Sequence, residues 1–250
     1  MLYVDIKKRL ASFELRIQFE TDKTPLGLLG ASGAGKSYTL KAIAGIERPD
    51  SGRIILNGKT LFDSEKKINL PPQKRKVGYL FQDFALFPNM TVLQNIKTGL
   101  HREERKEREK LAMELIEKFR LEGLENVRPQ TLSGGEKQRA ALARIFASKP
   151  DVLLLDEPFS SLDTFLKWEL EEEMKQIFAS FSGDVIIVSH EIDEVFELCE
   201  EVVRIRDGAA QKKISVKDFY NIILQENKSA RISLSKEKEA LFQSSKSTNH

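Results

Sequence analysis

The chain has 250 residues, of which 40% are hydrophobic and 31% charged, and its net charge is +2 at pH 7. This length is enough for one full hydrophobic core that carries an inserted lobe. The even charge balance gives no electrostatic support for a nucleic-acid partner, because such proteins usually carry a clustered basic excess. No apolar run approaches the roughly 20 residues of a membrane-spanning helix, and the N-terminus lacks a signal-peptide pattern. We therefore expect a cytoplasmic chain that reaches a membrane only through partners, and the single Cys199 agrees with a reducing compartment.

The first expected elements are strands of two kinds. Residues 13–20 alternate apolar and polar side chains, which predicts a half-buried strand. Four later apolar runs lack this alternation and are typical of strands that a parallel sheet buries on both faces: 26–29, 77–81, 152–155 and 185–188. Segments with helical spacing lie between several of them. The pattern predicts an α/β core with a wound, mainly parallel sheet and an N-terminal antiparallel β portion.

Between residues 84 and 150 the pattern changes. Residues 102–110 are almost all charged, and they are followed by an apolar stripe at helical spacing: Leu111, Leu115, Ile116 and Phe119. We predict a mostly helical lobe over residues 84–150, inserted between two parts of one core, residues 1–83 and 151–225. Residues 226–250 are polar with little periodicity, which predicts a flexible tail.

A phosphate-binding loop is predicted between the second expected strand and a helical run at 38–44. Residues 30–37 read GASGAGKS and match the pattern G-x-x-x-x-G-K-[ST] without a mismatch. The glycines let successive backbone N–H groups point inward at the positive end of a helix. Lys36 adds a charge for the β- and γ-phosphates, and the Ser37 hydroxyl suits Mg²⁺. The candidate ATP-binding residues here are Gly30, Ala31, Ser32, Gly33, Ala34, Gly35, Lys36, Ser37 and Tyr38.

Two carboxylates end the buried run at 152–155. Asp156 is suited to hold Mg²⁺, and Glu157 can polarise the water that attacks the γ-phosphate. For an isolated acidic pair, helix capping explains the position at least as well. Downstream of a complete phosphate loop the catalytic interpretation is favoured, although the loop alone leaves kinases, GTPases and many ATPases open.

Residues 132–139, LSGGEKQR, narrow that choice. They resemble the signature motif of the ATP-binding cassette ATPases of membrane transporters, and the resemblance extends over residues 1–225. It implies that two chains enclose two ATP molecules head to tail as a homodimer or paired cassette. Each chain then contributes its signature residues to the γ-phosphate held by its partner. The residues implied for this contact in trans are Ser133, Gly134, Gly135 and Glu136, together with Asp163 in the segment Ser161-Leu162-Asp163.

The same resemblance assigns three further positions. Gln82 matches the glutamine that contacts Mg²⁺ and senses the membrane partner, and His190 matches the histidine that contacts the γ-phosphate. The implied catalytic pair is thus Glu157 and His190, and the implied Mg²⁺ residues are Ser37, Gln82 and Asp156. An aromatic near the N-terminus stacks on adenine in this family. Phe13 is the candidate, and ordinary core packing explains it equally well.

Within the family, residues 83–92 and 156–163 resemble bacterial importers that depend on a binding protein. Residues 8–13 and 70–78 are similar to ATPases of molybdate, tungstate and sulfate importers. The resemblance implies an ATPase on the cytoplasmic face of the membrane. Its implied partners are integral permease subunits and, indirectly, an extracytoplasmic solute-binding protein. Import of another solute, an exporter subunit, or a soluble cassette ATPase in DNA repair or translation are the alternatives.

Overall fold

The computed structural model describes residues 1–101, 103–160 and 164–225. The predicted tail at 226–250 and the predicted in-trans residue Asp163 lie outside this part of the chain. In the described residues, no helix is both long enough and apolar enough to span a bilayer.

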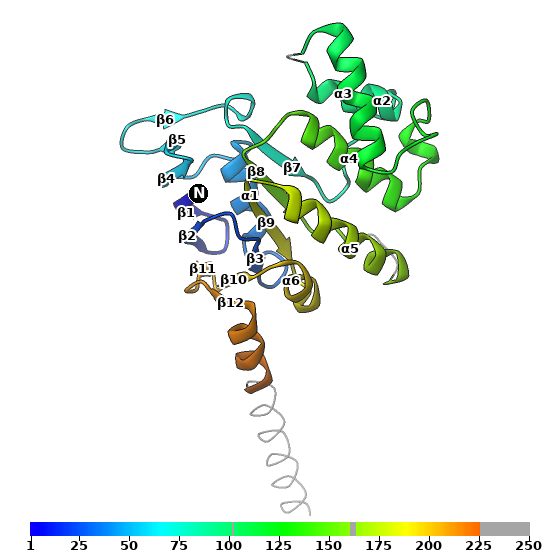
Figure 1. Ribbon diagram of the computed structural model, residues 1–250. Helices are drawn as coiled ribbons and strands as arrows, with labels where there is room; N and C mark the ends of the chain where they lie inside the picture. The colour runs from blue at the N-terminus through cyan, green and yellow to red at the C-terminus, as the bar shows by residue number, and fades with distance from the viewer. Residues whose placement is uncertain (102, 161–163, 226–250) are drawn as a thin grey trace, which may run out of the picture.

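One mixed sheet of twelve strands organises the described residues (Figure 1), in the order β6-β5-β4-β1-β2-β11-β10-β3-β9-β8-β7 with β12 beside β10. The antiparallel half consists of β1 (Leu2–Arg9), β2 (Glu14–Thr21), β4 (Ser51–Leu56), β5 (Lys59–Asp63) and β6 (Ile68–Asn69). The parallel half consists of β3 (Leu26–Leu29), β7 (Val77–Leu80), β8 (Val152–Asp156), β9 (Asp184–Ser189) and β10 (Glu201–Arg206). The short strands β11 (Ala209–Ala210) and β12 (Ile214–Ser215) pair with β10. The predicted combination of a parallel core and an N-terminal antiparallel part is confirmed.

The antiparallel half follows the predicted alternation. Leu15, Ile17 and Phe19 on β2 are buried while the residues between them are exposed. β1 pairs with β2 along its whole length and with β4 on its other edge. Such a strand has one face on the core and the other towards solvent, which is why its sequence alternates.

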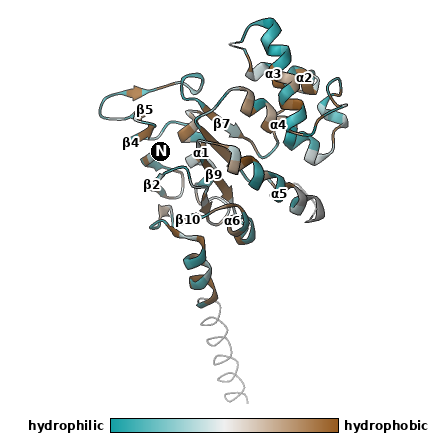
Figure 2. Cartoon of the chain, in the orientation of Figure 1, coloured by the Kyte–Doolittle hydropathy of each residue, from teal (hydrophilic) through white to brown (hydrophobic). Residues whose placement is uncertain are grey.

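The parallel strands separate two hydrophobic clusters. On β8, Leu153 and Leu155 pack into one cluster, whereas Val152 and Leu154 pack into the other. β3, β8 and β9 are therefore buried along their whole length, and the strand labelled β9 is coloured as hydrophobic in Figure 2. Burial on both faces explains the absence of alternation in these runs.

Helices cover both faces of the sheet. α1 (Lys36–Ala44) contributes to the same cluster as the antiparallel strands. Three helices lie between β7 and β8, namely α2 (Val92–Gly99), α3 (Arg105–Lys118) and α4 (Gly134–Ala147), and Figure 1 shows them grouped together. The remaining elements are α5 (Thr164–Ser180), α6 (Ile192–Leu198), the 3₁₀ turns Pro72–Lys74 and Pro129–Thr131, and a final helix over residues 216–225.

The helical segment between β7 and β8 has the predicted apolar stripe. Ile116 and Phe119 are buried, and Leu111 and Leu115 are half-buried against the same cluster. The charged residues of α3 are exposed apart from the half-buried Arg108, and much of this helix is coloured as hydrophilic in Figure 2. The boundaries of the lobe at residues 84 and 150 stay a prediction.

Candidate functional site

The predicted site residues of the core follow the carboxyl ends of neighbouring parallel strands. Residues 30–35 follow β3, Gln82 lies just beyond β7, Glu157 follows β8, and His190 follows β9. These strands lie side by side in the order β3-β9-β8-β7. Because parallel strands end at the same edge of a sheet, the fold collects residues from four distant segments at one place.

The phosphate loop requires glycine at two positions. Gly35 has a φ of 99°, and a Cβ there would lie 2.4 Å from Cδ1 of Leu15, so a side chain would be both strained and obstructed. At Gly30, a Cβ would lie 2.6 Å from the carbonyl oxygen of Ile205. The loop therefore presents its backbone to an incoming group with no side chains in the way at these positions.

Lys36 is the first residue of α1 and is only 4% exposed. Its Nζ donates hydrogen bonds to the carbonyl oxygens of Gly30 at 2.8 Å and Ala31 at 3.0 Å. Burial lowers the pKa of Lys36, and the nearby carboxylates of Glu157 and Asp156 oppose that shift. The ammonium group thus spans the loop and lies close to both acidic residues.

The side chain of Tyr38 forms its hydrogen bond with Arg48 and not with the phosphate loop. Its hydroxyl donates to the carbonyl oxygen of Arg48 at 2.8 Å, and burial raises the pKa of Tyr38 to about 12. The phenol is therefore occupied at the far end of the helix, and the backbone N–H of Tyr38 is the part of this residue that remains for phosphate binding.

Asp156 is buried at the end of β8 and accepts two hydrogen bonds. The Ser37 hydroxyl donates to Oδ1 at 2.7 Å, and the Tyr79 hydroxyl donates to Oδ2 at 2.7 Å. Sequence reasoning predicted Ser37 and Asp156 but missed Tyr79. The available signal was a tyrosine inside the apolar run at 77–81, because a buried phenol needs a hydrogen-bond partner.

Glu157 adopts a left-handed backbone conformation, with φ of 48°. Its N–H donates to the carbonyl oxygen of Val188 at 3.0 Å, which ties it to β9. Its Oε1 lies 3.5 Å from Nδ1 of His190, whose side chain is 50% exposed. A strained conformation in a charged residue typically marks a position whose side-chain direction matters. The two residues predicted to be catalytic are thus neighbours.

Gln82 is exposed and reaches the same region through Ser160. Its Nε2 donates to Oγ of Ser160 at 3.1 Å, and that hydroxyl donates to the carbonyl oxygen of Glu157 at 3.1 Å. Ser160 is a second residue that sequence reasoning did not single out. No pattern in the sequence pointed to it, because the contact joins residues that lie 78 positions apart.

The residues present fit a magnesium ion that is bound together with phosphates. Ser37 and Asp156 are hydrogen-bonded to each other and both carry oxygen atoms that can coordinate a metal, and Gln82, which is bonded to Ser160, carries an amide oxygen. The described residues contain no group of three or more His, Cys, Asp or Glu side chains placed to hold a metal. A cation here would accordingly complete its shell with phosphate and water oxygens, as Mg²⁺ commonly does.

Phe13 lies in the turn between β1 and β2 and is half-buried. Its ring packs against Gly208, where a Cβ would lie 2.5 Å from Cδ2. Phe13, Ala34 and Tyr38 all pack on the same hydrophobic cluster. The ring thus has a packing role, and the predicted contact with adenine remains a prediction.

The signature residues form the start of α4. Ser133 is the N-cap, and it exchanges hydrogen bonds with Glu136, whose pKa these bonds lower. Gly134 and Gly135 are the first two residues of the helix, whose first N–H groups have no partner within the helix itself. Among the described residues, no hydrogen bond or ion pair joins 133–136 to 30–38. The single chain leaves these two predicted phosphate-binding elements unconnected.

The match to a family model decides the identity. The model described as "ABC transporter" matches residues 15–160. The chain belongs to the ABC transporter family. This confirms the predicted family and fold class.

Two relatives of this chain are import ATP-binding proteins by name. It is 40% identical over 208 residues to the molybdenum import ATP-binding protein ModC of Rhodospirillum rubrum, covering 83% of this chain and 56% of that protein. The chain thus spans little more than half the length of that relative. It is 40% identical over 220 residues to the molybdate/tungstate import ATP-binding protein WtpC of Archaeoglobus fulgidus, covering 88% of this chain and 89% of the other.

A solved structure is also similar to the cassette. It is a dimer of the ATP-binding cassette MJ0796 in a post-hydrolysis state with ADP and Pi. The TM-score is 0.71 and the identity 25%, over 86% of this chain and 99% of the other.

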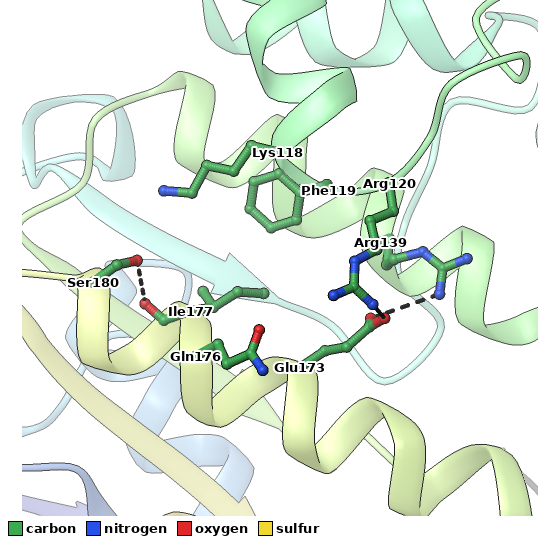
Figure 3. A pocket seen from close by; sticks show the side chains of 8 residues that line it. All are labelled: Lys118, Phe119, Arg120, Arg139, Glu173, Gln176, Ile177 and Ser180. Carbon is green, nitrogen blue, oxygen red and sulfur yellow. Dashed lines mark hydrogen bonds and ion pairs between the residues drawn. The ribbon is translucent and has the colours of Figure 1, made fainter.

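A separate cavity of about 200 Å³ lies where α3 and α4 meet α5. Figure 3 shows Arg120 and Arg139 converging on the carboxylate of Glu173. The Arg120 and Arg139 guanidiniums lie 2.8 Å and 3.7 Å from its two oxygens. None of the predicted site residues lines this cavity. The Arg139 ion pair connects α4 to α5, and the Arg120 ion pair connects the segment just after α3 to α5.

Proposed function

We propose that the chain binds and hydrolyses ATP as the energy-supplying subunit of a membrane importer for molybdate or tungstate. The observation that carries the enzymatic part is the 3.5 Å approach of His190 to Glu157, next to a phosphate loop whose Ser37 is bonded to Asp156. This combination provides a place for the phosphates, a cation and an attacking water at one edge of the sheet.

Each residue has a distinct role in the proposed reaction. The N–H groups of residues 33–38 bind the phosphates, and Lys36 exchanges its carbonyl partners for phosphate oxygens. Ser37, Asp156 and Gln82 would hold Mg²⁺, which neutralises charge on the phosphates. Glu157 orients the attacking water and accepts its proton, and His190 donates a hydrogen bond to the γ-phosphate.

Two chains complete the site in this proposal. Ser133, Gly134, Gly135 and Glu136 of one chain approach the γ-phosphate held by the other, with Asp163 beside it. The capped start of α4 supports this role, because a helix N-terminus attracts anions. The similar cassette of known structure is a dimer. Phe13 is proposed to stack on the adenine.

The transported solute rests on similarity. The two relatives described above are named for molybdenum and for molybdate or tungstate import, and one of them matches this chain over most of its own length. Permease subunits and an external solute-binding protein are the proposed partners. Import of a different solute by the same kind of complex is the second candidate.

The test is the ATPase activity of the native complex, isolated from membranes by means of this chain and supplied with its solute-binding protein. Molybdate, tungstate and sulfate are compared with unrelated solutes, and a complex that carries Glu157→Gln provides the background. Stimulation by molybdate or tungstate supports the whole proposal. Stimulation only by another solute retains the importer and rejects the oxyanion. Absence of any co-purifying membrane protein in several mild detergents contradicts the importer role.

A further inference from the structure

A buried serine forms hydrogen bonds on both sides of the turn that carries His190. Ser189 is the last residue of β9 and is 1% exposed. Its Oγ accepts a hydrogen bond of 2.9 Å from the N–H of Glu191 and donates one to Oε2 of Glu194. Glu194, on α6, is itself only 3% exposed. The backbone on both sides of His190 is therefore anchored to a buried carboxylate.

One lysine neutralises the carboxylates around this turn. Lys167 Nζ lies 2.7 Å from Oε1 of Glu194 and also forms an ion pair with Glu191. Burial by itself lowers the pKa of Lys167, but its hydrogen bonds to Glu191 and Glu194 outweigh burial and raise it. The lysine thus stays charged and joins both acidic residues that flank the His190 turn.

Glu171 is a third acidic residue near Lys167, and its carboxylate adds to the negative charge that the lysine balances. Glu171 lies one turn along α5 and is 9% exposed. Burial raises the pKa of Glu171, Lys167 lowers it, and the charge of Glu194 raises it further. Removing the lysine would leave Glu171 and Glu194 as neighbouring, largely buried carboxylates. A buried charge without its partner is strongly unfavourable, so the turn would rearrange.

The position of Lys167 in the chain links two segments of the proposed site. It lies in the first part of α5, shortly after residues 161–163, whereas Glu191 and Glu194 lie directly after His190. The ion pairs therefore join the start of α5 to the histidine turn. Under the proposed function, Asp163 contacts the ATP held by the other chain, and Lys167 follows it four positions later in the sequence.

We propose that Lys167 is a positioning residue for hydrolysis: its ion pairs with Glu194 and Glu191 hold the His190 imidazole beside Glu157, and they connect that placement to the first part of α5. This inference rests on the proposed ATPase function. The ion pairs of Lys167 are with Glu191 and Glu194, neither of which is a proposed ATP-binding residue, so we expect its loss to lower turnover and to leave ATP binding intact.

The kinetic test uses the native membrane complex with two substitutions. Lys167→Met removes the charge but keeps a long side chain, and we expect kcat to fall by about tenfold while the KM for ATP stays within about twofold. Lys167→Arg keeps the charge and restores most of the turnover. The matched control is Lys175→Met. Lys175 also lies on α5, and it forms ion pairs with Glu172 of α5 and Glu197 of α6 rather than with the residues next to His190. It is expected to leave kcat unchanged.

A spectroscopic test is independent of turnover. The chain has three histidines, so the His190 imidazole signals in an NMR spectrum are assigned by comparison with His190→Gln. Lys167→Met should shift or broaden these signals in the full-length chain, whereas Lys167→Arg and Lys175→Met should not. Thermal melts of each variant establish that it is folded. If Lys167→Met does not fold, Glu191→Gln replaces it, because Glu191 is exposed and the same changes are expected.

The outcomes separate this inference from the proposed function. If kcat and the His190 signals are unchanged in Lys167→Met, or if Lys175→Met has the same effect, Lys167 has no positioning role. If the wild-type complex does not hydrolyse ATP, the proposed function fails. In that case the NMR comparison still decides whether Lys167 places His190.

Discussion

The hydroxyl of Tyr79 donates a 2.7 Å hydrogen bond to Oδ2 of Asp156, opposite the bond that Oδ1 receives from Ser37. β7 and β8 are parallel neighbours, with Tyr79 opposite Leu154, so the phenol extends along the strand to the carboxylate. Burial and the charge of Asp156 raise the pKa of Tyr79, which keeps it a donor. The carboxylate is thus fixed in the orientation in which one oxygen faces the phosphate loop.

Tyr79→Phe should lower both the stability of the fold and the apparent affinity for Mg²⁺ during ATP hydrolysis. We expect the free energy of unfolding to drop by about 1–2 kcal/mol, because a buried acceptor loses its partner. The Mg²⁺ concentration for half-maximal ATP hydrolysis should rise, because the carboxylate is no longer held. Urea unfolding and a magnesium titration measure the two effects. Tyr220→Phe is the control, since Tyr220 is exposed. Identical behaviour of the two variants would remove Tyr79 from the site.

Glu157→Gln should abolish most hydrolysis while retaining ATP binding. The amide cannot accept the proton of the attacking water, and a loss of at least about 100-fold in kcat is expected. With ATP and Mg²⁺ the variant should elute from gel filtration as a dimer. Glu122→Gln, at an exposed position, is the matched control. Normal turnover in Glu157→Gln would exclude Glu157 as the catalytic base.

Lys36→Ala should weaken nucleotide binding itself, because the fixed cation next to the phosphates is lost. An increase in the Kd for ATP of at least about tenfold is expected by calorimetry, in line with the strength of charge-assisted hydrogen bonds. Lys41→Ala, on the same helix, serves as the control. An unchanged Kd in Lys36→Ala would argue against the phosphate site.

Phe13→Ala should raise the KM for ATP with little effect on kcat, because stacking contributes to binding rather than to the chemical step. Phe13→Tyr keeps the ring and should behave as wild type. The ring is only half-buried against Gly208, so the variant is expected to stay folded. If Phe13→Ala changes stability alone, its role is packing.

The capping box of α4 predicts a pH dependence. Hydrogen bonds from Ser133 lower the pKa of Glu136 in the folded chain. A carboxyl with a lowered folded pKa stabilises the fold above its ordinary pKa of about 4.3, and this contribution is lost as the pH falls. The difference in unfolding free energy between wild type and Glu136→Gln should therefore be largest near pH 7 and shrink as the pH falls below about 4.3 and through the lowered pKa of Glu136. Urea unfolding at several pH values measures this difference. A difference that does not change with pH would show that the charge on Glu136 is unimportant.

The local chemistry of this protein was determined by its sequence. The loop at 30–37, the acidic pair at 156–157 and the capped helix start at 133–136 are each continuous in the chain, and their residue types define what they can bind. The strands were predictable as well. Period-two alternation in β2 and uninterrupted apolar runs in β3, β8 and β9 directly reflect burial on one or two faces. The end of β7 differed by one residue, at Leu80 rather than Phe81.

Tertiary structure alone decided how these pieces meet. Tyr79 reaches Asp156 because β7 lies beside β8, although the two residues are 77 positions apart. Ser160 links Gln82 to Glu157, and Lys167 reaches the histidine turn from another helix. The left-handed backbone of Glu157 likewise depends on its bond to Val188 of β9. Such contacts arise from strand order and helix packing. Residue types and their spacing along the chain do not reveal these contacts. The order of the strands brings together segments that can lie any distance apart in the sequence.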